Sequence, residues 1–333
     1  MTSYDANACA RESGPAALRG ALEAAPSYNE AARPRLSWPV SDFLNARIDE
    51  QQTLLTPWLR SGGLAMVHAW RGVGKTHFAI GAAVAIATGS KFLKWSADKP
   101  SRVLYVDGEM PAKQMQDRFR AATSAAKKCA PEFLRIITPD ILPAQCPVPN
   151  LLTPEGQGAI EDDLQDCDVV FFDNVATLFR TADDQNSAST WLAAQDYILG
   201  LRRLGLAVVL IDHDNKSGGN RGTSSKHDVL DSVIQLKQPA DYRPEQGARF
   251  EIHFTKHRGF WGRDALPFEA SLIETQDGPI WTVTEAEEAE RERVAEMVNE
   301  GAKEREIRAA LGIGGSKLKR LKSELQDQGR ISS

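Results

Sequence analysis

The chain has 333 residues, of which 42% are hydrophobic and 26% charged, and its formal net charge is −5. These values are typical of a globular protein with one or two domains, and they exclude a uniformly basic nucleic-acid binder, so any DNA contact must come from local patches or a central channel. No apolar run approaches the roughly 18 residues of a transmembrane helix and the N-terminus lacks a signal-peptide pattern, so we expect a cytoplasmic protein without a membrane partner.

The first 59 residues divide into two stretches of different composition. Residues 1–33 are rich in Ala, Ser, Glu and Pro and lack a sustained apolar period, which predicts a disordered tail. Apolar residues return over 36–59, and we expect this stretch to pack on the core ahead of the first central strand. We therefore assign residues 34–284 to the main domain.

A glycine-containing turn between a strand and a helix is the strongest motif in the chain. Residues 64–68 form a short apolar run that predicts a buried strand, and residues 77–87 predict an amphipathic helix. The turn between them has the order of a phosphate-binding P-loop, in which backbone N–H groups at the helix start face the phosphates. In that interpretation Lys75 reaches the β- and γ-phosphates of ATP and the Thr76 hydroxyl binds Mg²⁺. The residues predicted to contact the nucleotide are Arg71, Gly72, Val73, Gly74, Lys75, Thr76 and His77.

The P-loop pattern has one departure and one alternative explanation. Ala69 stands where the usual pattern begins with glycine, and a strand end with negative φ accommodates alanine. The alternative is a chance Gly-Lys-Thr at an ordinary helix start. The strand and helix signals on both sides favour the P-loop.

Further apolar strands alternate with helical patterns along the chain. The predicted strands are 103–106, 169–173 and 207–211, and the predicted helices are 112–127, 156–164 and 191–204. Strands that are apolar throughout and separated by helices predict a parallel sheet covered on both faces, which is an α/β fold. Shorter strand signals follow at 229–236, 250–255, 268–273 and 281–283, and they predict a hairpin-rich ending to this core.

Carboxylates follow two of the apolar strands. Asp173 ends one of them, where the Mg²⁺-binding carboxylate of a P-loop ATPase is expected. Glu109 lies just beyond another and is our candidate for the base that orients the attacking water. Asp107 is an alternative base, and Glu109 could instead have only a helix-capping role. Because the carboxyl ends of parallel strands meet at one edge of the sheet, these residues can share a site with Lys75.

Polar and basic residues follow the later strands. His213 comes after the strand 207–211 and can sense the γ-phosphate by hydrogen bonding, although the neighbouring Asp212 and Asp214 are alternatives. The cations Lys256 and Arg258 are spaced by one residue at a strand end, so their side chains point to the same side. Such a pair could act as an arginine finger on a neighbouring subunit's γ-phosphate, or it could be an exposed basic strand edge.

Residues 215–226 form a loop without any apolar residue, and it carries Lys216, Arg221 and Lys226. We expect this loop to be mobile and positive, which suits the phosphate backbone of single-stranded DNA in a channel. The alternative is an ordinary flexible loop.

The last part of the chain, residues 285–333, differs in composition from the core. Helical patterns cover 285–300, 303–311 and 316–328, and the glycines of 312–315 separate the last two. This order resembles a helix-turn-helix whose last helix is basic, so Lys317, Lys319 and Arg320 are candidates for contact with duplex DNA. The alternative is a three-helix interaction or capping module with a solvated basic face.

Taken in this order, the motifs resemble those of RecA-like P-loop ATPases in the AAA and DnaB-type ring helicase group, particularly the plasmid-type hexameric replicative helicases such as RepA. The resemblance covers about residues 36–283 and rests on residues 71–79, 103–110, 170–174, 211–213, 216–218, 221–222 and 254–259.

The resemblance implies a RecA-like core that assembles into a ring, usually a hexamer, with ATP bound between neighbouring subunits. It assigns Glu109 as the catalytic glutamate, Asp173 as the Mg²⁺ carboxylate and His213 as the sensor. It also implies that Lys256 and Arg258 act in trans, on the ATP bound by a neighbouring subunit. The helix-turn-helix-like tail is not part of that core.

The sequence therefore leads to the hypothesis of a cytoplasmic, DNA-dependent ATPase of the ring helicase type, which moves on single-stranded DNA and serves replication of a plasmid, phage or other mobile element. One alternative is an ATP-controlled DNA-binding regulator or partition-like factor, whose C-terminal helices read a duplex site. A second is a recombination or repair ATPase that forms filaments.

Overall fold

The structure is a computed structural model of the chain, and it describes residues 36–126, 133–181, 188–214, 224–276 and 278–331. The predicted disordered tail, residues 1–33, lies outside these residues. The chain divides into two compact units, Met1–Glu50 and Gln51–Ser333. The domain boundaries predicted near residues 34 and 284 stay predictions. Within the described part of the chain, no helix is long and apolar enough to cross a membrane.

The described residues of the first unit contain one short helix, α2 (Val40–Asn45), which buries none of its residues. The side chains of Trp38, Phe43 and Leu44 are 65%, 54% and 75% exposed. The expectation that this stretch packs on the core of the second unit stays a prediction for residues 36–50, whereas residues 54, 55, 58 and 59 are buried in that core. A six-residue helix offers too little apolar surface to build a core of its own.

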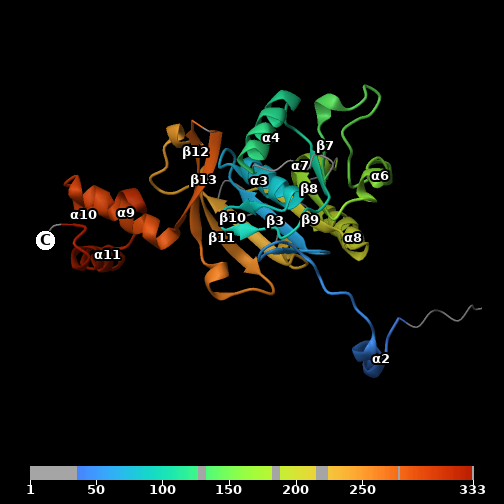
Figure 1. Cartoon of the computed structure of the whole chain (residues 1–333), viewed down its shortest axis with the longest axis horizontal. Helices are drawn as coiled ribbons and strands as arrows, with labels where there is room; N and C mark the ends of the chain where they lie inside the picture. Colours follow the sequence, from blue (N-terminus) through green and yellow to red (C-terminus); the bar gives the residue numbers. More distant parts are fainter. Residues whose placement is uncertain (1–35, 127–132, 182–187, 215–223, 277, 332–333) are drawn as a thin grey trace, which may run out of the picture. The chain divides into compact units, whose positions relative to one another are not determined.

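The second unit is built on a nine-stranded sheet with the strand order β13-β12-β11-β10-β3-β9-β8-β6-β7 (Figure 1). The strands from β10 to β7 are parallel to their neighbours, and β11, β12 and β13 form an antiparallel extension at one side. The bounds are β3 Leu64–Ala69, β6 Val103–Asp107, β7 Leu134–Ile137, β8 Val169–Asp173, β9 Ala207–His213, β10 Ser232–Lys237, β11 Arg249–His257, β12 Phe268–Thr275 and β13 Gly278–Glu285. The predicted α/β fold with a mainly parallel sheet is confirmed.

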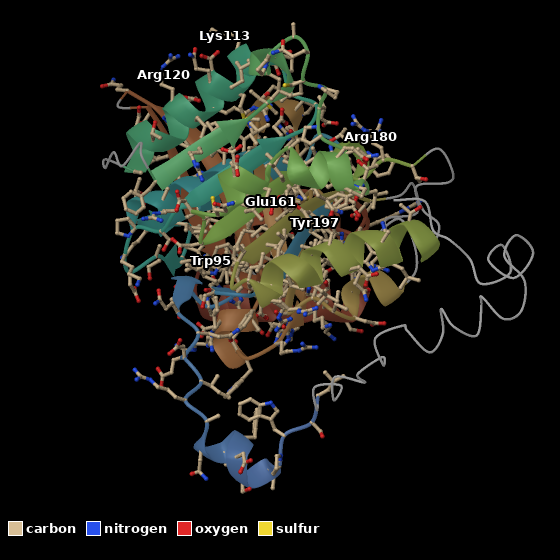
Figure 2. All side chains as sticks on the ribbon, turned by 90° about the vertical axis from the view of Figure 1, so that its right-hand side faces the viewer. Trp95, Lys113, Arg120, Glu161, Arg180 and Tyr197 are labelled. Carbon is tan, nitrogen blue, oxygen red and sulfur yellow. The ribbon has the colours of Figure 1, made fainter. Side chains whose placement is uncertain are left out.

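Helices cover both faces of this sheet. Successive residues of each apolar strand point to opposite sides, so each strand has apolar side chains on both faces that need cover. On one face Val67, Tyr105 and Phe171 pack with α3 (Lys75–Thr88) and α4 (Ala112–Ala126). On the other face Met66 and Phe172 pack with α6 (Glu161–Leu164), α7 (Val175–Leu178) and α8 (Ala188–Arg203). Figure 2 shows Lys113 and Arg120 as side chains of α4, and Tyr197 as a side chain of α8. The apolar strands β3, β6, β8 and β9 are therefore covered on both faces.

Shorter elements complete the second unit. The helix predicted over 156–164 is instead two short helices, α5 (Pro154–Gly158) and α6, because Gly156 and Gly158 weaken helix propagation. Among the described residues, two small hairpins and four 3₁₀ turns connect the main elements: β1 Thr53–Leu55 with β2 Leu59–Arg60, β4 Lys91–Phe92 with β5 Trp95–Ser96, η2 Pro139–Ile141, η3 Ser224–His227, η4 Pro244–Gln246 and η5 Gly262–Ala265.

Three helices end the chain: α9 (Ala286–Asn299), α10 (Glu304–Leu311) and α11 (Gly315–Asp327). They share a small apolar core of their own, which includes Val294, Ile307 and Leu321. Gly312 ends α10 with a left-handed φ of 64°, a conformation that glycine adopts without steric cost. The three-helix arrangement agrees with the sequence pattern, whereas the helix-turn-helix assignment stays a prediction.

A buried ion-pair network joins α9 to the antiparallel strands. The Arg293 guanidinium lies 3.3 Å from Asp241 and also pairs with Glu269, and its side chain is 10% exposed. Arg249 pairs with the same two carboxylates, at 3.2 Å to Asp241 and 2.7 Å to Glu269. Two guanidinium groups and two carboxylates thus form ion pairs at the junction.

We expect Arg293→Ala to lower the free energy of unfolding by about 3 kcal/mol, because it leaves buried carboxylates with less compensation. Urea unfolding followed by circular dichroism measures this change. Arg305→Ala, which truncates an exposed arginine of α10, serves as the control and should change stability by less than about 0.5 kcal/mol. Equal effects of the two substitutions would contradict a stabilising role of the network.

Candidate nucleotide-binding site

The P-loop connects the end of β3 to the start of α3. Gly72 and Gly74 have φ values of 81° and 117°, which only glycine adopts readily, and Gly74 is the N-cap of α3. A Cβ atom on Gly74 would also lie 3.0 Å from the Phe250 ring. The glycine at position 74 is therefore required both by its conformation and by its packing. Ala69 is accommodated as the last residue of β3.

Lys75 is buried at the first position of α3. Its ammonium donates hydrogen bonds to the carbonyls of Ala69 (3.0 Å) and Trp70 (3.2 Å), so it lies over the loop. Burial lowers the pKa of Lys75, while the nearby charges of Asp173 and Glu109, among other carboxylates, oppose that shift. The cation is thus surrounded by the acidic residues that the sequence analysis selected.

Asp173, the last residue of β8, lies beside Thr76. The carboxylate is buried and accepts hydrogen bonds from the hydroxyls of Thr76 and Tyr105, the latter at 2.7 Å. Burial raises the pKa of Asp173, and the two hydroxyl donors together with the Lys75 charge oppose the rise. The structure therefore brings the two predicted magnesium ligands together.

Glu109 stands on a turn that Asp107 shapes. The Asp107 carboxylate accepts hydrogen bonds from the Met110 N–H (2.9 Å) and the Thr138 hydroxyl (3.0 Å). A Cβ atom on Gly108 would lie 2.3 Å from the Thr177 hydroxyl oxygen, so this turn requires glycine. Glu109 itself is exposed, and its charge acts on Lys75. Asp107, the alternative base, is thus occupied in holding the turn that carries Glu109.

His213 is the last residue of β9, and its ring lies beside Asn174, the residue that follows Asp173. Its Nε2 is 3.2 Å from the Asn174 amide nitrogen, while the Asn174 amide oxygen accepts the Thr177 N–H at 3.1 Å. Nε2 therefore accepts a hydrogen bond, and in the neutral ring the proton resides on Nδ1, which has no partner among the described residues. Burial and the Lys75 charge lower the pKa of His213, which keeps the ring neutral near pH 7. The Nδ1–H is thus a buried donor without a partner in the described part of the chain.

The two acids that flank His213 have buried partners. Asp214 is 2.6 Å from His68 Nδ1, and Asp212 forms an ion pair of 3.5 Å with Lys226. His213 differs from these acids in having a ring nitrogen without a partner among the described residues, and its sensor role stays a prediction. Lys226 was predicted to contact DNA, but the structure corrects that interpretation, because its ammonium is buried where it compensates the charge of Asp212. Lys216 and Arg221 lie outside the described residues.

The family comparison agrees with this geometry. Residues 29–219 match the family described as AAA domain. The chain belongs to this family of P-loop ATPases. Among solved structures, the flagellar accessory protein FlaH from Methanocaldococcus jannaschii aligns with 67% of this chain and 91% of its own, at 12% identity and a TM-score of 0.44. A similarity that low does not assign a function. None of the curated proteins compared with the sequence matches it.

The residues of this AAA-domain protein fit the ATP and Mg²⁺ that P-loop ATPases generally use. Mg²⁺ prefers oxygen ligands, and the Thr76 hydroxyl and the Asp173 carboxylate are such ligands in mutual contact. The backbone N–H groups at the start of α3 and the Lys75 ammonium suit the phosphates. Residues 71–77, predicted to contact the nucleotide, form the turn and the first residues of that helix.

Lys256 and Arg258 lie at the opposite edge of the sheet. In the strand register Lys256 is beside Val233 near the start of β10, and Arg258 donates its backbone N–H to Asp231, which itself bonds to Leu64. Leu64 is about 16 Å along β3 from the P-loop end of the strand. The Lys256 ammonium donates to the carbonyl of His227, and Arg258, 58% exposed, pairs with Asp231 at 3.1 Å. The structure does not bring these cations to the P-loop of the same chain.

Three of the four basic side chains of α11 are paired with acidic residues of the other terminal helices. Lys317 is 2.7 Å from Glu290, and Arg320 is 3.3 Å from Glu287. Lys322 is likewise paired, whereas Lys319 is exposed. Residues 285–333 contain eleven acidic and ten basic side chains. The predicted basic face is therefore largely neutralised within the module.

Two residues of the site escaped the sequence analysis. Tyr105 was read as one of the apolar residues of its strand, although a hydroxyl in such a strand is a signal that a polar partner is close. Asn174 directly follows Asp173, but nothing in the sequence shows that it contacts His213.

We expect Asn174→Asp to move the proton of His213 from Nδ1 to Nε2. The new carboxylate still accepts the Thr177 N–H, but it offers Nε2 an acceptor in place of a donor. Nitrogen-15 NMR of the histidine rings measures the tautomer, with His213→Gln used to assign the signal. A proton that stays on Nδ1 in the variant would contradict the assigned hydrogen bond.

The buried Asp107 should make stability depend on pH. Burial raises its pKa to about 6 from 3.8, so between these values the folded state holds a proton that the unfolded state has released. Stability conferred by this proton is present at low pH and is lost as the pH rises through about 6. Between pH 4 and pH 7, the wild type should lose about 2 kcal/mol relative to Asp107→Asn. Urea unfolding at several pH values measures this, and parallel curves would contradict it.

Proposed function

We propose that this protein is a DNA-dependent ATP hydrolase that works as a ring-forming motor of the replicative helicase type, in the replication of a plasmid, phage or other mobile element. The observation that carries the hydrolase part is the gathering of Lys75, Thr76, Asp173, Glu109 and His213 at one edge of the sheet. The motor part is supported by the order of motifs in the sequence.

The residues of the site have separate tasks in this proposal. The P-loop N–H groups and Lys75 bind the phosphates of ATP, and Thr76 with Asp173 hold Mg²⁺, which neutralises charge on the β- and γ-phosphate oxygens when bound. Glu109, exposed beside the ammonium, orients the attacking water and accepts its proton. His213 donates Nδ1–H to a γ-phosphate oxygen, and it thereby senses whether that phosphate is present.

The position of Lys256 and Arg258 supports a site that is completed by a second copy. These cations lie at the amino edge of the parallel strands, whereas the P-loop lies at the carboxyl edge. Head-to-tail packing of copies would set one edge against the other, and such a heterologous contact closes into a ring when the rotation fits. We propose a hexameric ring in which Lys256 and Arg258 stabilise charge on the neighbour's γ-phosphate.

Single-stranded DNA is the proposed partner of the loop that follows β9, the strand that ends at His213. Lys216 and Arg221 come within eight residues of His213, so a change at the sensor can reach them through a short segment. Lys226 is left out of this set, because it compensates Asp212. Cations of this kind bind a phosphate backbone without sequence preference.

A second candidate function is that of an ATP-controlled regulator, in which α9, α10 and α11 bind duplex DNA through Lys317, Lys319 and Arg320. The separate apolar core of these helices favours an independent binding module. The ion pairs of α11 argue against a strongly basic surface, so a protein-interaction role for the module is the better supported one.

We expect single-stranded DNA to stimulate ATP hydrolysis by the wild type and Lys75→Ala to reduce hydrolysis by about 100-fold or more, because the ammonium is the principal charge on the phosphates. Phosphate release measures both effects. Lys91→Ala, which truncates an exposed lysine of β4, serves as the control and should hydrolyse ATP normally.

Three outcomes would redirect this proposal. Undiminished hydrolysis by Lys75→Ala would show that the P-loop is not the site. A response to duplex DNA alone would favour the regulator. Stimulated hydrolysis without unwinding of forked DNA, together with open filaments rather than rings in electron microscopy, would favour a recombination or repair ATPase.

A further inference from the structure

Tyr105 is held in one orientation inside the sheet core. Its side chain is fully buried, and its ring stacks on Phe171 with a centroid distance of 5.8 Å. The Phe119 ring of α4 meets it edge-on at 5.4 Å. Aromatic contacts on two sides fix the ring plane, and so they fix where the hydroxyl points.

The hydroxyl of Tyr105 points at the carboxylate of Asp173. The distance from Oη to Asp173 Oδ2 is 2.7 Å, which is typical of a strong hydrogen bond to a charged acceptor. Both groups are buried, so water does not compete for either partner. Asp173 is therefore anchored on Oδ2, and its rotation about the last side-chain bond is restricted.

We propose that Tyr105 is a positioning residue for Mg²⁺, whose hydroxyl anchors Asp173 Oδ2 and so holds the carboxylate in the orientation that binds the metal of a magnesium–nucleotide complex. The inference rests on the proposed function, since it requires that Thr76 and Asp173 hold Mg²⁺. Tyr105 acts through Asp173, and hydrogen-bond partners of metal-binding carboxylates typically contribute 10- to 100-fold in metal affinity.

Tyr197 of α8 provides a matched control on the opposite face of the sheet. Its ring lies 6.4 Å from Phe172, the neighbour of Phe171 in β8. Its hydroxyl oxygen is buried and has no hydrogen-bond partner among the described residues. Figure 2 shows Tyr197 on α8, which packs on the face away from Tyr105. Tyr197→Phe removes a tyrosine hydroxyl, as Tyr105→Phe does, from a ring that also lies near a phenylalanine of β8. It leaves the surroundings of Asp173 unchanged.

The experiment is a titration of Mg²⁺ against binding of a fluorescent ATP analogue, which reads metal binding without hydrolysis. In Tyr105→Phe the aromatic ring remains, and we expect about tenfold more Mg²⁺ at half-maximal binding than in the wild type. We expect Tyr197→Phe to match the wild type within twofold. Thermal unfolding confirms that each variant is folded.

A double-mutant cycle with Asp173→Asn tests whether Tyr105 acts through the carboxylate. In the Asp173→Asn background we expect Tyr105→Phe to change the Mg²⁺ requirement by less than twofold. An undiminished effect in that background would overturn the proposal, because Tyr105 would then act through packing.

Two other results would also overturn it, and they are distinguishable. A Mg²⁺ requirement of Tyr105→Phe equal to that of the wild type would exclude positioning by Tyr105 and leave the proposed function intact. A wild type that binds the nucleotide without any response to Mg²⁺ would overturn the metal site, and with it both the proposed function and this inference.

Discussion

The charge of Asp173 is the constraint on which the site depends. A carboxylate at the end of an apolar, fully buried strand is costly unless donors and cations compensate it. Here the compensation comes from Tyr105 on β6 and from Lys75 and Thr76 on α3. These residues belong to separate segments, so the alignment of two strands and one helix is needed to satisfy a single group. The packing of the core that aligns these segments therefore also sets the geometry of the site.

The parallel sheet separates the chemistry of the chain into two edges. The P-loop, Asp173 and His213 lie at the carboxyl edge, where helix starts and strand ends supply N–H groups and side chains for anions. Lys256 and Arg258, at the end of β11, lie at the other edge because β11 runs antiparallel to β10. In the proposed function, these cations act on the site of a second copy, which is why that function involves an assembly.

Local signals predicted most of the core. The P-loop and the apolar strands could be predicted because each depends on a few adjacent residues. The strands are buried on both faces, so they are continuous apolar runs in the sequence. The prediction of one continuous helix over 156–164 was wrong because it gave too little weight to the glycines at 156 and 158.

The sequence by itself determined the class of fold, the P-loop and the carboxylates at the strand ends, since these depend on periodicity and on neighbouring residues. Tertiary structure decided the partners of the polar side chains. Tyr105 and Asp173 are 68 residues apart in the chain, and only the pairing of β6 with β8 brings them into contact. Lys226 was expected at a DNA backbone and instead compensates Asp212, because a buried carboxylate takes the nearest cation that the fold supplies. Such pairings depend on distance in space, which spacing along the chain does not encode.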